Sequence, residues 1–233
     1  MSGQASGRPS QFLPGSSAPV PSAFGALAAM RLTAPSPRLA SSRLAPGLLA
    51  AGLALLLGAC GSGAVPTTFD LTALPGAARS GAARRSIVVA EPVGLQPFEA
   101  DRIIVREPGG AVSYLGGGQW ADRLPRLVQT RVIQSLENAN RLKSVSRPGD
   151  KVAADTVLIT ELRAFDINAG TREAVVDLSA KLVQESSGTV VAAKVFQARV
   201  PVGEVNAPVA ANGLDQALSL VLADLVRWIN AGG

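Results

Sequence analysis

The sequence predicts a single α+β domain, in which a mixed, mostly antiparallel sheet packs against two main amphipathic helices. Apolar residues recur at helical spacing over residues 120–138 and again over about 207–230. Between these segments, residues 174–183 alternate apolar and largely polar side chains, as a strand with one buried face does. Helices with an apolar stripe and a sheet with an apolar face bury these surfaces against each other. We therefore expect both helices on one side of the sheet.

Two long strands flank the centre of this predicted sheet. Residues 156–167 predict a strand before the alternating segment, and residues 190–200 predict another after it. The turn Ser186-Ser187-Gly188 joins the last two strands. We therefore expect a long antiparallel hairpin.

Shorter strands are predicted nearer the N-terminus of the domain. The first covers residues 69–74, and the second, residues 86–90, is almost entirely apolar. A hairpin is expected between residues 101–106 and 111–115, since the turn Glu107-Pro108-Gly109-Gly110 combines a fixed Pro dihedral with Gly at positive φ. Gly116-Gly117-Gly118 predicts a plain loop rather than a phosphate cradle, because the Lys-Ser/Thr of a P-loop is missing.

The two helices each carry an apolar stripe. The first helix is expected to begin at Trp120, with Pro125 tolerated in its first turns. Its stripe consists of Trp120, Leu124, Leu127, Val128, Val132 and Leu136, and that of the second helix consists of Leu214, Ala217 or Leu218, Val221, Leu225, Trp228 and Ile229.

An apolar run near the N-terminus has the features of a secretory signal peptide. Residues 44–59 carry no charge and consist mostly of Leu, Ala and Gly, and arginines precede them. The run has sixteen residues, with Pro46 near its start, and a membrane-spanning helix needs roughly 20. We therefore predict that residues 1–59 are a cleaved signal rather than a retained membrane span.

The end of this run contains Cys60, the only cysteine of the chain. Leu57-Gly58-Ala59-Cys60 resembles the lipobox of bacterial lipoproteins, in which the cysteine thiol carries a diacylglyceryl group. A lone cysteine forms no intramolecular disulfide, and acylation explains its presence in an exported protein. We predict lipidation of Cys60 and a lipidated tether over residues 60–68. The alternative is an ordinary secretory signal that ends beside an unrelated cysteine.

The first 29 residues are rich in Ser, Pro, Gly and Ala and carry one charge, Arg8. They place an unusual polar tail ahead of the signal, which makes Met30 the expected translation start. A genuinely long n-region is the alternative. In both cases the folded domain is expected over residues 69–233.

The net charge of +5 does not indicate a nucleic-acid-binding protein. Four of the 22 basic residues and none of the 17 acidic residues precede Cys60, so the mature chain has a net charge of +1. Nucleic-acid binding needs a clustered excess of Lys and Arg. Arg84-Arg85 could touch anionic lipid headgroups beside the tether, but a solvated linker is the simpler interpretation.

The mature chain offers little for catalysis or metal binding. It has no histidine, which removes the commonest general base, and its one cysteine is assigned to lipid. No G-x-S-x-G nucleophile motif is present. Asp166, Glu173 and Asp177 could form an acid/base pair, but their positions at strand ends and on a polar strand face predict solvated surface. We therefore expect no enzyme activity, no metal site and no cofactor apart from the covalent lipid.

Several blocks of residues resemble the ABC-type transport auxiliary lipoproteins of the PqiC type. The similarity follows the lipobox and extends to the end of the chain, so it spans nearly all of the mature protein. Its blocks are Phe69-Asp70-Leu71, Ile104-Val105-Arg106, Tyr114, Gln119 to Leu124, Phe165-Asp166, Val175 to Leu178, Phe196 with Pro201, and Leu225 to Ile229.

This resemblance implies a non-enzymatic partner of an ABC transporter with a periplasmic MCE-domain protein. Such a system exchanges phospholipid between membranes, and the lipoprotein would dock at the periplasmic face of the outer membrane. A homo-oligomer is a candidate assembly of the lipoprotein there. Gly61 rather than Asp after the cysteine also favours the outer membrane. An envelope scaffold that contacts peptidoglycan enzymes is one alternative function. A periplasmic module that itself holds an acyl chain is another.

Two aromatic residues are candidates for partner binding or for the core. Trp120 belongs to the most family-like block, and Tyr114 precedes it. Trp120 shares the stripe of Leu124 and Val128, which packing alone would select, so a core role is the simpler interpretation.

Overall fold

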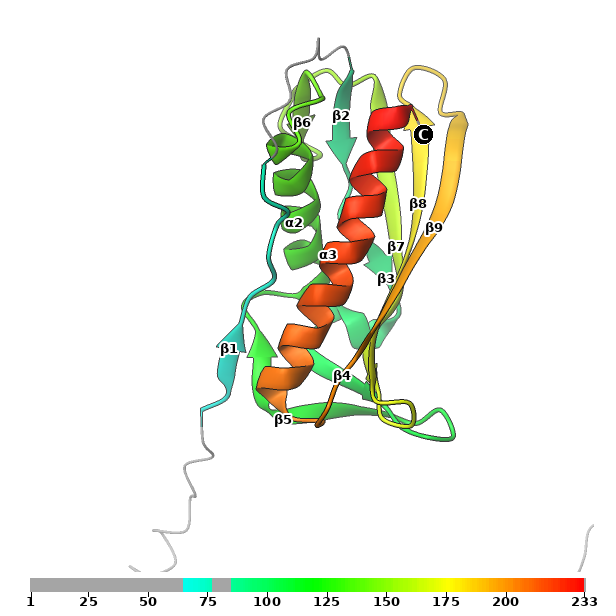
Figure 1. Ribbon diagram of the computed structural model, residues 1–233. Helices are drawn as coiled ribbons and strands as arrows, with labels where there is room; N and C mark the ends of the chain where they lie inside the picture. Colours follow the sequence, from blue (N-terminus) through cyan, green and yellow to red (C-terminus); the bar gives the residue numbers. More distant parts are fainter. Residues whose placement is uncertain (1–64, 77–84, 233) are drawn as a thin grey trace, which may run out of the picture. The chain divides into compact units, whose positions relative to one another are not determined.

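The computed structural model describes residues 65–76 and 85–232. Within them, nine strands form one curled mixed sheet. Both α-helices lie on one side of it, as expected (Figure 1). The predicted α+β class is confirmed.

Strand β7 (Thr156–Asn168) is the centre of the sheet. One side pairs antiparallel with β8 (Glu173–Gln184), which pairs in turn with β9 (Val190–Pro201). These three strands confirm the predicted hairpin and its neighbour. The other side of β7 pairs in parallel with three short strands, which are β2 (Ser86–Val89), β3 (Val93–Gly94) and β4 (Arg102–Arg106).

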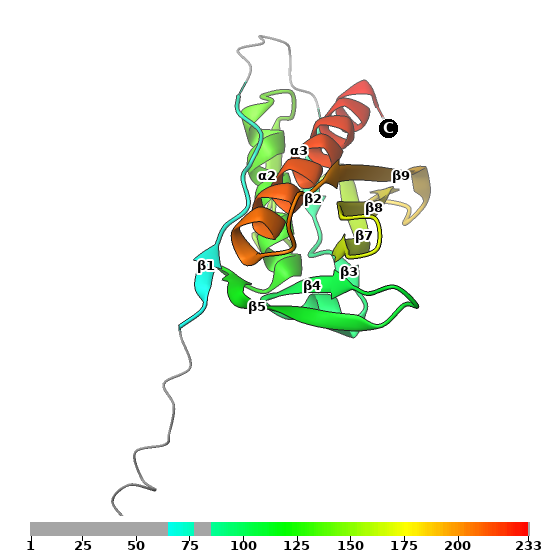
Figure 2. The same ribbon diagram turned by 60° about the horizontal axis from the view of Figure 1, so that its bottom comes forward.

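The remaining strands extend the sheet beyond these short ones. Strand β6 (Ser144–Ser146) pairs in parallel with β2, and β5 (Val112–Trp120) pairs antiparallel with β4, which confirms the predicted hairpin. Strand β1 (Thr67–Phe69) runs parallel to β5. Figure 2 shows β4 and β5 curling beneath the first turns of α3. The sequence did not predict β3, β6 or the 3₁₀ helix η1 (Gln96–Glu99).

Helices α2 (Leu124–Asn138) and α3 (Ala207–Ala231) bury their apolar stripes against the sheet. The Asn206 side chain accepts a hydrogen bond from the Val209 amide and so caps the start of α3. Gly232, with φ of 111°, ends α3 in the left-handed conformation that favours glycine. The local capping signals and the tertiary packing therefore agree for this helix.

Helix α3 is also long and apolar enough to span a membrane, with a mean hydropathy of 1.3 over its most apolar window. More than half of that window is buried inside the domain. A helix that is apolar because it packs in a core passes the same test, and the contacts of α3 with β8 and β9 identify it as such a helix.

The predicted first strand, residues 69–74, was wrong over most of its length. Only Thr67–Phe69 are in a strand, and the chain continues beside α2 without a strand partner. Local side-chain bonds compete with pairing here, because the Asp70 carboxylate accepts from the Leu71 amide and the Ser135 hydroxyl accepts from the Leu74 amide.

The predicted start of the first helix at Trp120 was also wrong. Trp120 is the last residue of β5, and its amide donates to the Asp101 carbonyl at 2.7 Å. The Ala121 amide donates to the Phe69 carbonyl at 2.8 Å. These hydrogen bonds to the sheet hold the chain extended at Trp120. The helix begins instead at Leu124, with Pro125, a residue suited to a helix start, in its first turn.

Gly116-Gly117-Gly118 are part of β5 and not the predicted plain loop. The pairing between the two strands shifts at this point. Ile104 of β4 pairs with Tyr114, and Arg102 pairs with Gln119, so two residue steps in β4 correspond to five in β5. The glycines therefore form a bulge, and Gly117 has φ of 79°. A Cβ on Gly118 would lie 2.5 Å from that of Ala207 and 2.8 Å from the ring of Phe69. Only glycine fits here, where Phe69 of β1 and Ala207 of α3 approach β5 closely.

Candidate functional site

The predicted lipidation site, Cys60, lies outside the described residues, as do the signal segment and Met30. The described chain starts at Val65, within the predicted tether of residues 60–68, and enters the fold through β1. The path from β1 onward therefore connects the tether to the domain.

A strap of residues 70–76 follows β1 and lies beside α2 (Figure 1). Arg131 of α2 forms an ion pair with Asp70 at 2.5 Å. Thr72 donates through both its amide and its hydroxyl to the carboxylate of Asp215 on α3. Leu71 inserts its side chain into the core, where it is buried. The strap thereby attaches the tether to both helices.

Trp120 packs inside the domain. Its side chain is 1% exposed and meets the ring of Phe165 edge-on, with the centroids 5.8 Å apart. This edge-to-face geometry is the favourable one for two aromatic rings. Trp120 therefore presents no surface to a partner in this conformation.

Tyr114 lies on the same strand but is 48% exposed. The guanidinium of Arg102 sits over its ring, 5.4 Å from the centroid. The bulge at the glycines separates the two aromatic residues, so the structure does not bring Trp120 and Tyr114 into one site.

Asp166 corrects the prediction that the candidate carboxylates are solvated. Its side chain is 2% exposed and accepts a hydrogen bond from Arg106 at 2.8 Å. This hydrogen bond and the charge of Asp166 raise the pKa of Arg106 above its ordinary value. Asp177 and Glu173 are partly exposed and lie near Arg163 and Arg199. The three carboxylates thus form ion pairs with arginines rather than an acid/base pair.

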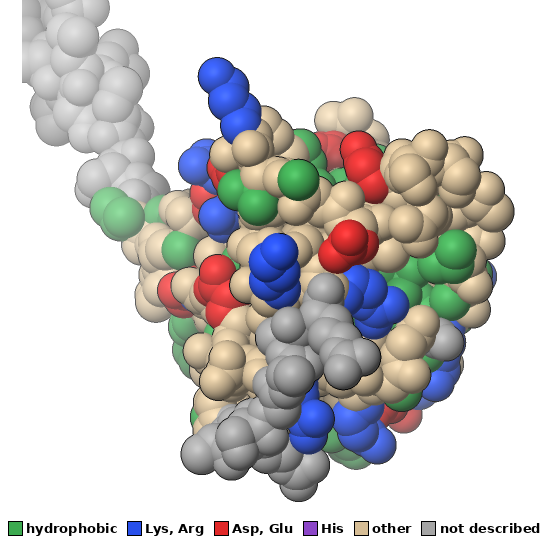
Figure 3. All heavy atoms as spheres, turned by 90° about the horizontal axis from the view of Figure 1, so that it is seen from above, with side chains coloured by type: hydrophobic (Ala, Val, Ile, Leu, Met, Phe, Trp, Pro, Cys, Tyr) green, Lys and Arg blue, Asp and Glu red, His purple; other side chains and the backbone are tan. Residues whose placement is uncertain are grey.

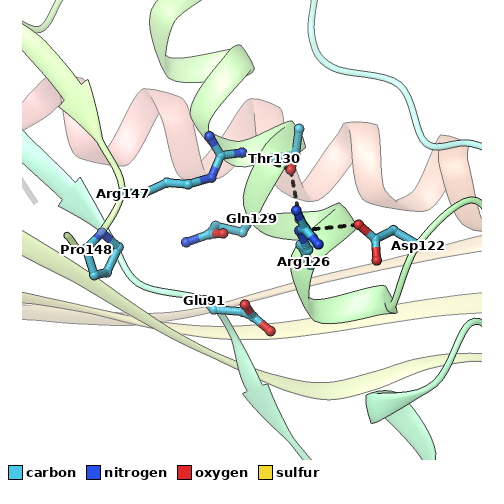
Figure 4. A pocket seen from close by; sticks show the side chains of 7 residues that line it. All are labelled: Glu91, Asp122, Arg126, Gln129, Thr130, Arg147 and Pro148. Atoms are coloured by element: carbon cyan, nitrogen blue, oxygen red, sulfur yellow. Dashed lines mark hydrogen bonds and ion pairs between the residues drawn. The ribbon is translucent and has the colours of Figure 1, made fainter. Parts of the chain in front are cut away.

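A polar hollow of about 640 Å³ opens beside the start of α2 (Figure 4). Arg126 pairs with Asp122 at 3.3 Å, and Arg147 donates to the Thr130 hydroxyl at 3.0 Å. The hollow is lined by Glu91, Asp122, Arg126, Gln129, Thr130, Arg147 and Pro148.

The lining of the hollow suits ions or hydrogen-bonding groups rather than an acyl chain. Glu91 is already paired with Arg123 at 2.7 Å, so the acids near the hollow have basic partners. Gln129 is buried and donates to the Val89 carbonyl at 2.9 Å. These contacts hold the loop after β2 against α2, and no side chain of the hollow is placed as a nucleophile beside a base.

Arg85 also has a structural partner. Its guanidinium donates to the carbonyl oxygen of Ile229 and, at 3.5 Å, to that of Gly232. A cation at a helix C-terminus satisfies free carbonyls and complements the helix dipole. Figure 3 shows the molecule from this end, with Lys and Arg side chains interspersed with Asp and Glu. Such mixed charges fit a solvated end of the domain better than a basic membrane patch.

Among residues 65–76 and 85–232, no three His, Cys, Asp or Glu side chains come together as a possible metal site. The described geometry is therefore that of a packed domain with polar surface features.

A family model described as the ABC-type transport auxiliary lipoprotein component matches residues 69–226. The chain belongs to this family. The match covers β1 through most of α3, which is nearly the whole described domain. Membership makes the chain a lipoprotein component of transport systems, and it agrees with the prediction that Cys60 is lipidated.

Solved structures share the fold of this auxiliary lipoprotein domain. The crystal structure of protein XCC0632 from Xanthomonas campestris is 25% identical, with a TM-score of 0.63, and the similarity covers 72% of this chain and 97% of that one. A crystal structure of an uncharacterized protein has a TM-score of 0.56 at 12% identity, covering 71% and 99% of the two chains.

A curated relative adds a sequence match. An uncharacterized protein of Bradyrhizobium diazoefficiens is 29% identical over 147 residues, which cover 61% of this chain and 39% of that protein. The match therefore spans about two fifths of that relative's length.

Sequence reasoning missed the contacts that define the strap and the hollow. Asp70, Arg131 and Asp215 are far apart in sequence, and no local pattern pairs them. The buried pair of Arg106 and Asp166 arises from parallel strands β4 and β7, whose pairing the sequence did not predict. Both residues did lie in family-like blocks, and Asp166 was also one of the candidate carboxylates.

Proposed function

We propose that this protein is the outer-membrane-anchored lipoprotein of an ABC transporter–MCE system, where it acts without catalysis as the docking component for phospholipid transport between membranes. The observation that carries the proposal is the family match over residues 69–226, which begins nine residues after the lipobox cysteine. Cys60 is the lipidated residue in this proposal. The partners are the membrane and a periplasmic MCE-domain protein.

The arrangement of the domain supports a docking role. The strap fixes the tether to both helices, so the domain is held close to the membrane that carries the lipid. At most about 3.5 Å of chain per residue separates Cys60 from Thr67, which limits the distance to roughly 25 Å. A domain held so close to one membrane is suited to receive a transport protein that reaches across the periplasm.

Partner capture tests this proposal. The lipidated chain is purified with a C-terminal tag from crosslinked membranes, and the captured proteins are identified by mass spectrometry. The proposal predicts an MCE-domain protein together with the transporter subunits. A scaffold for wall synthesis would instead capture peptidoglycan enzymes, and that result would contradict the proposal.

The anchor is tested by Cys60→Ser, which removes the thiol that would carry the lipid. The variant is expected in the soluble fraction or as an uncleaved precursor, whereas the wild-type chain sediments with outer membranes in a density gradient. Val65→Ser, at an exposed position in the same tether region, is the matched control and should leave sorting unchanged. A processed Cys60→Ser chain that stays with membranes would contradict the assignment of Cys60.

A further inference from the structure

Strand β5 lies at the end of the domain where the predicted tether enters. Thr67 of β1 pairs with Gly118 of β5, and Figures 1 and 2 show β1, β4 and β5 together at this lower end. Tyr114 precedes Gly118 on the same strand by at most roughly 15 Å of chain. The exposed part of β5 therefore lies close to the point from which the domain is tethered.

This part of β5 presents an amphipathic surface. Tyr114 is the only tyrosine of the chain and the one aromatic residue among the exposed large apolar side chains of residues 65–76 and 85–232. Val112, two residues before it on the strand, is 43% exposed, and the guanidinium of Arg102 lies over the tyrosine ring. Tyrosine and arginine combine an apolar body with a polar tip, and such side chains gather where hydrocarbon meets lipid headgroups. We define Arg102, Val112 and Tyr114 as the β5 face.

The charges of the β4–β5 hairpin balance. Its two arginines, Arg102 and Arg106, are matched in number by Asp101 and Glu107. Arg106 is already paired with Asp166 at 2.8 Å, whereas Arg102 forms no ion pair within the part of the chain that the structure describes. A balanced surface with a guanidinium at hand suits zwitterionic phospholipids, whose phosphate accepts hydrogen bonds from arginine.

We propose that the β5 face rests against the membrane that holds the lipid of Cys60, with zwitterionic phospholipid headgroups as its occupant. This inference rests on the proposed function, because the tether selects the membrane over other partners. At most roughly 25 Å of chain separates Cys60 from Thr67, and β1 is hydrogen-bonded directly to β5. The opposite end of the domain, where α3 ends (Figure 1), then points away from the membrane and stays accessible to a transport protein.

A fluorophore beside Tyr114 tests this contact. The full lipidated chain carrying Gly116→Cys is labelled on the new thiol and placed in vesicles of phosphatidylethanolamine and phosphatidylcholine that contain a lipid with a nitroxide headgroup. A Cβ at Gly116 has no described neighbour within 4 Å, so the label has room. Leu220→Cys is the control, because Leu220 is exposed but lies roughly 20 Å along α3 from Ala207, the residue that approaches Gly118.

Quenching by the nitroxide should be at least about twofold stronger at Gly116→Cys than at Leu220→Cys, because a side chain at the interface meets the headgroups. Equal quenching at both positions, or none at either, would overturn the membrane contact. Shielding of the Gly116→Cys label that requires an added protein would assign the β5 face to that protein and would overturn it as well.

The mass of the same purified chain separates this inference from the proposed function. A chain without lipid on Cys60 would overturn the anchor and the membrane contact together. A lipidated chain with equal quenching would overturn the membrane contact alone and would leave the anchor standing.

Substitutions in the β5 face test which side chains make the contact. Arg102→Gln together with Tyr114→Ser, in the Gly116→Cys chain, removes the guanidinium and the ring and should at least about halve the quenching. Val195→Ser is the matched control, because Val195 is 47% exposed but lies on β9, and it should leave the quenching unchanged. Unchanged quenching in the double variant would contradict the proposal.

Discussion

The two faces of the sheet differ in burial, although the same strands supply the side chains of both. In β7, Leu158 is fully buried beneath the helices, whereas its neighbour Ile159 is 41% exposed on the other side. In β9, Phe196 packs against α3 and Val195 faces away. Alternation along a strand therefore produces a helix-covered face that stabilises the domain and an open face that is free for contacts.

The open face is itself divided. Near the β4–β5 hairpin it carries the ion pairs of Arg106 with Asp166 and of Arg199 with Glu173. Further along β7, β8 and β9 it exposes Ile159 and Val195, which lie beside Lys181 and Glu161 in the strand register. Charge pairs tie neighbouring strands of one chain together, while exposed apolar side chains beside an unpaired edge have no such partner within the described domain.

Loss of Trp120 should give the largest effect, because this residue fills the helix-covered side. Trp120→Ala removes a buried ring and should lower the free energy of unfolding by about 3–5 kcal/mol. Tyr114→Ala, on the same strand but half exposed, should lower it by about 1 kcal/mol or less through loss of the contact with Arg102. Urea unfolding measures both, and equal losses would contradict the separation of the two aromatic residues.

Gly118→Ala should have the next largest effect. The added Cβ would meet Ala207 and Phe69 at 2.5 Å and 2.8 Å, and such overpacking costs about 1–3 kcal/mol. Gly116→Ala is the matched control, because a Cβ there has no described neighbour within 4 Å. If thermal unfolding shows no difference between the two variants, β1, β5 and α3 do not approach as described.

Removal of Arg106, which lies on the open face, should reduce the stability of the protein less. Arg106→Met leaves Asp166 without its ionic partner and should lower the free energy of unfolding by about 1.5 kcal/mol, since Arg106 is partly exposed to solvent. Because the folded state raises the pKa of Arg106, this contribution is complete below the ordinary arginine pKa and is lost only at pH above it.

The pH dependence provides the check on this ion pair. The difference between Arg106→Met and the wild-type chain should be constant between about pH 6 and 9, where the guanidinium stays protonated. Arg163→Met, which removes a longer and more exposed pair with Asp177 at 3.9 Å, should cost less. A difference that shrinks within this range would show that another group is responsible.

The sequence predicted the elements that have a strong period. Residues 174–183 alternate apolar and largely polar side chains and form most of β8, and the stripe over residues 207–230 forms α3 almost residue for residue. Local pattern determines these elements because each buries one face. The prediction of a strand over residues 69–74 was wrong, because side chains of Asp70 and of Ser135 on α2 accept hydrogen bonds from the backbone amides there.

The contacts of the site could not be predicted in the same way. Gly116-Gly117-Gly118 predicts a loop locally, but β1 and α3 need glycine at Gly118 for close approach. Trp120 fits a helical stripe, yet its backbone bonds to Asp101 in the sheet. In both cases tertiary contacts override local preference. Short parallel strands such as β3 and β6 have too few residues to show any period.

Exchange of phospholipid between the membranes tests the central claim most directly. Cells lacking the protein are pulse-labelled with a phospholipid precursor, and the label is followed in separated inner and outer membranes. The account predicts an altered exchange rate that the wild-type chain restores and Cys60→Ser does not. Exchange that is identical with and without the protein would contradict a role in phospholipid transport.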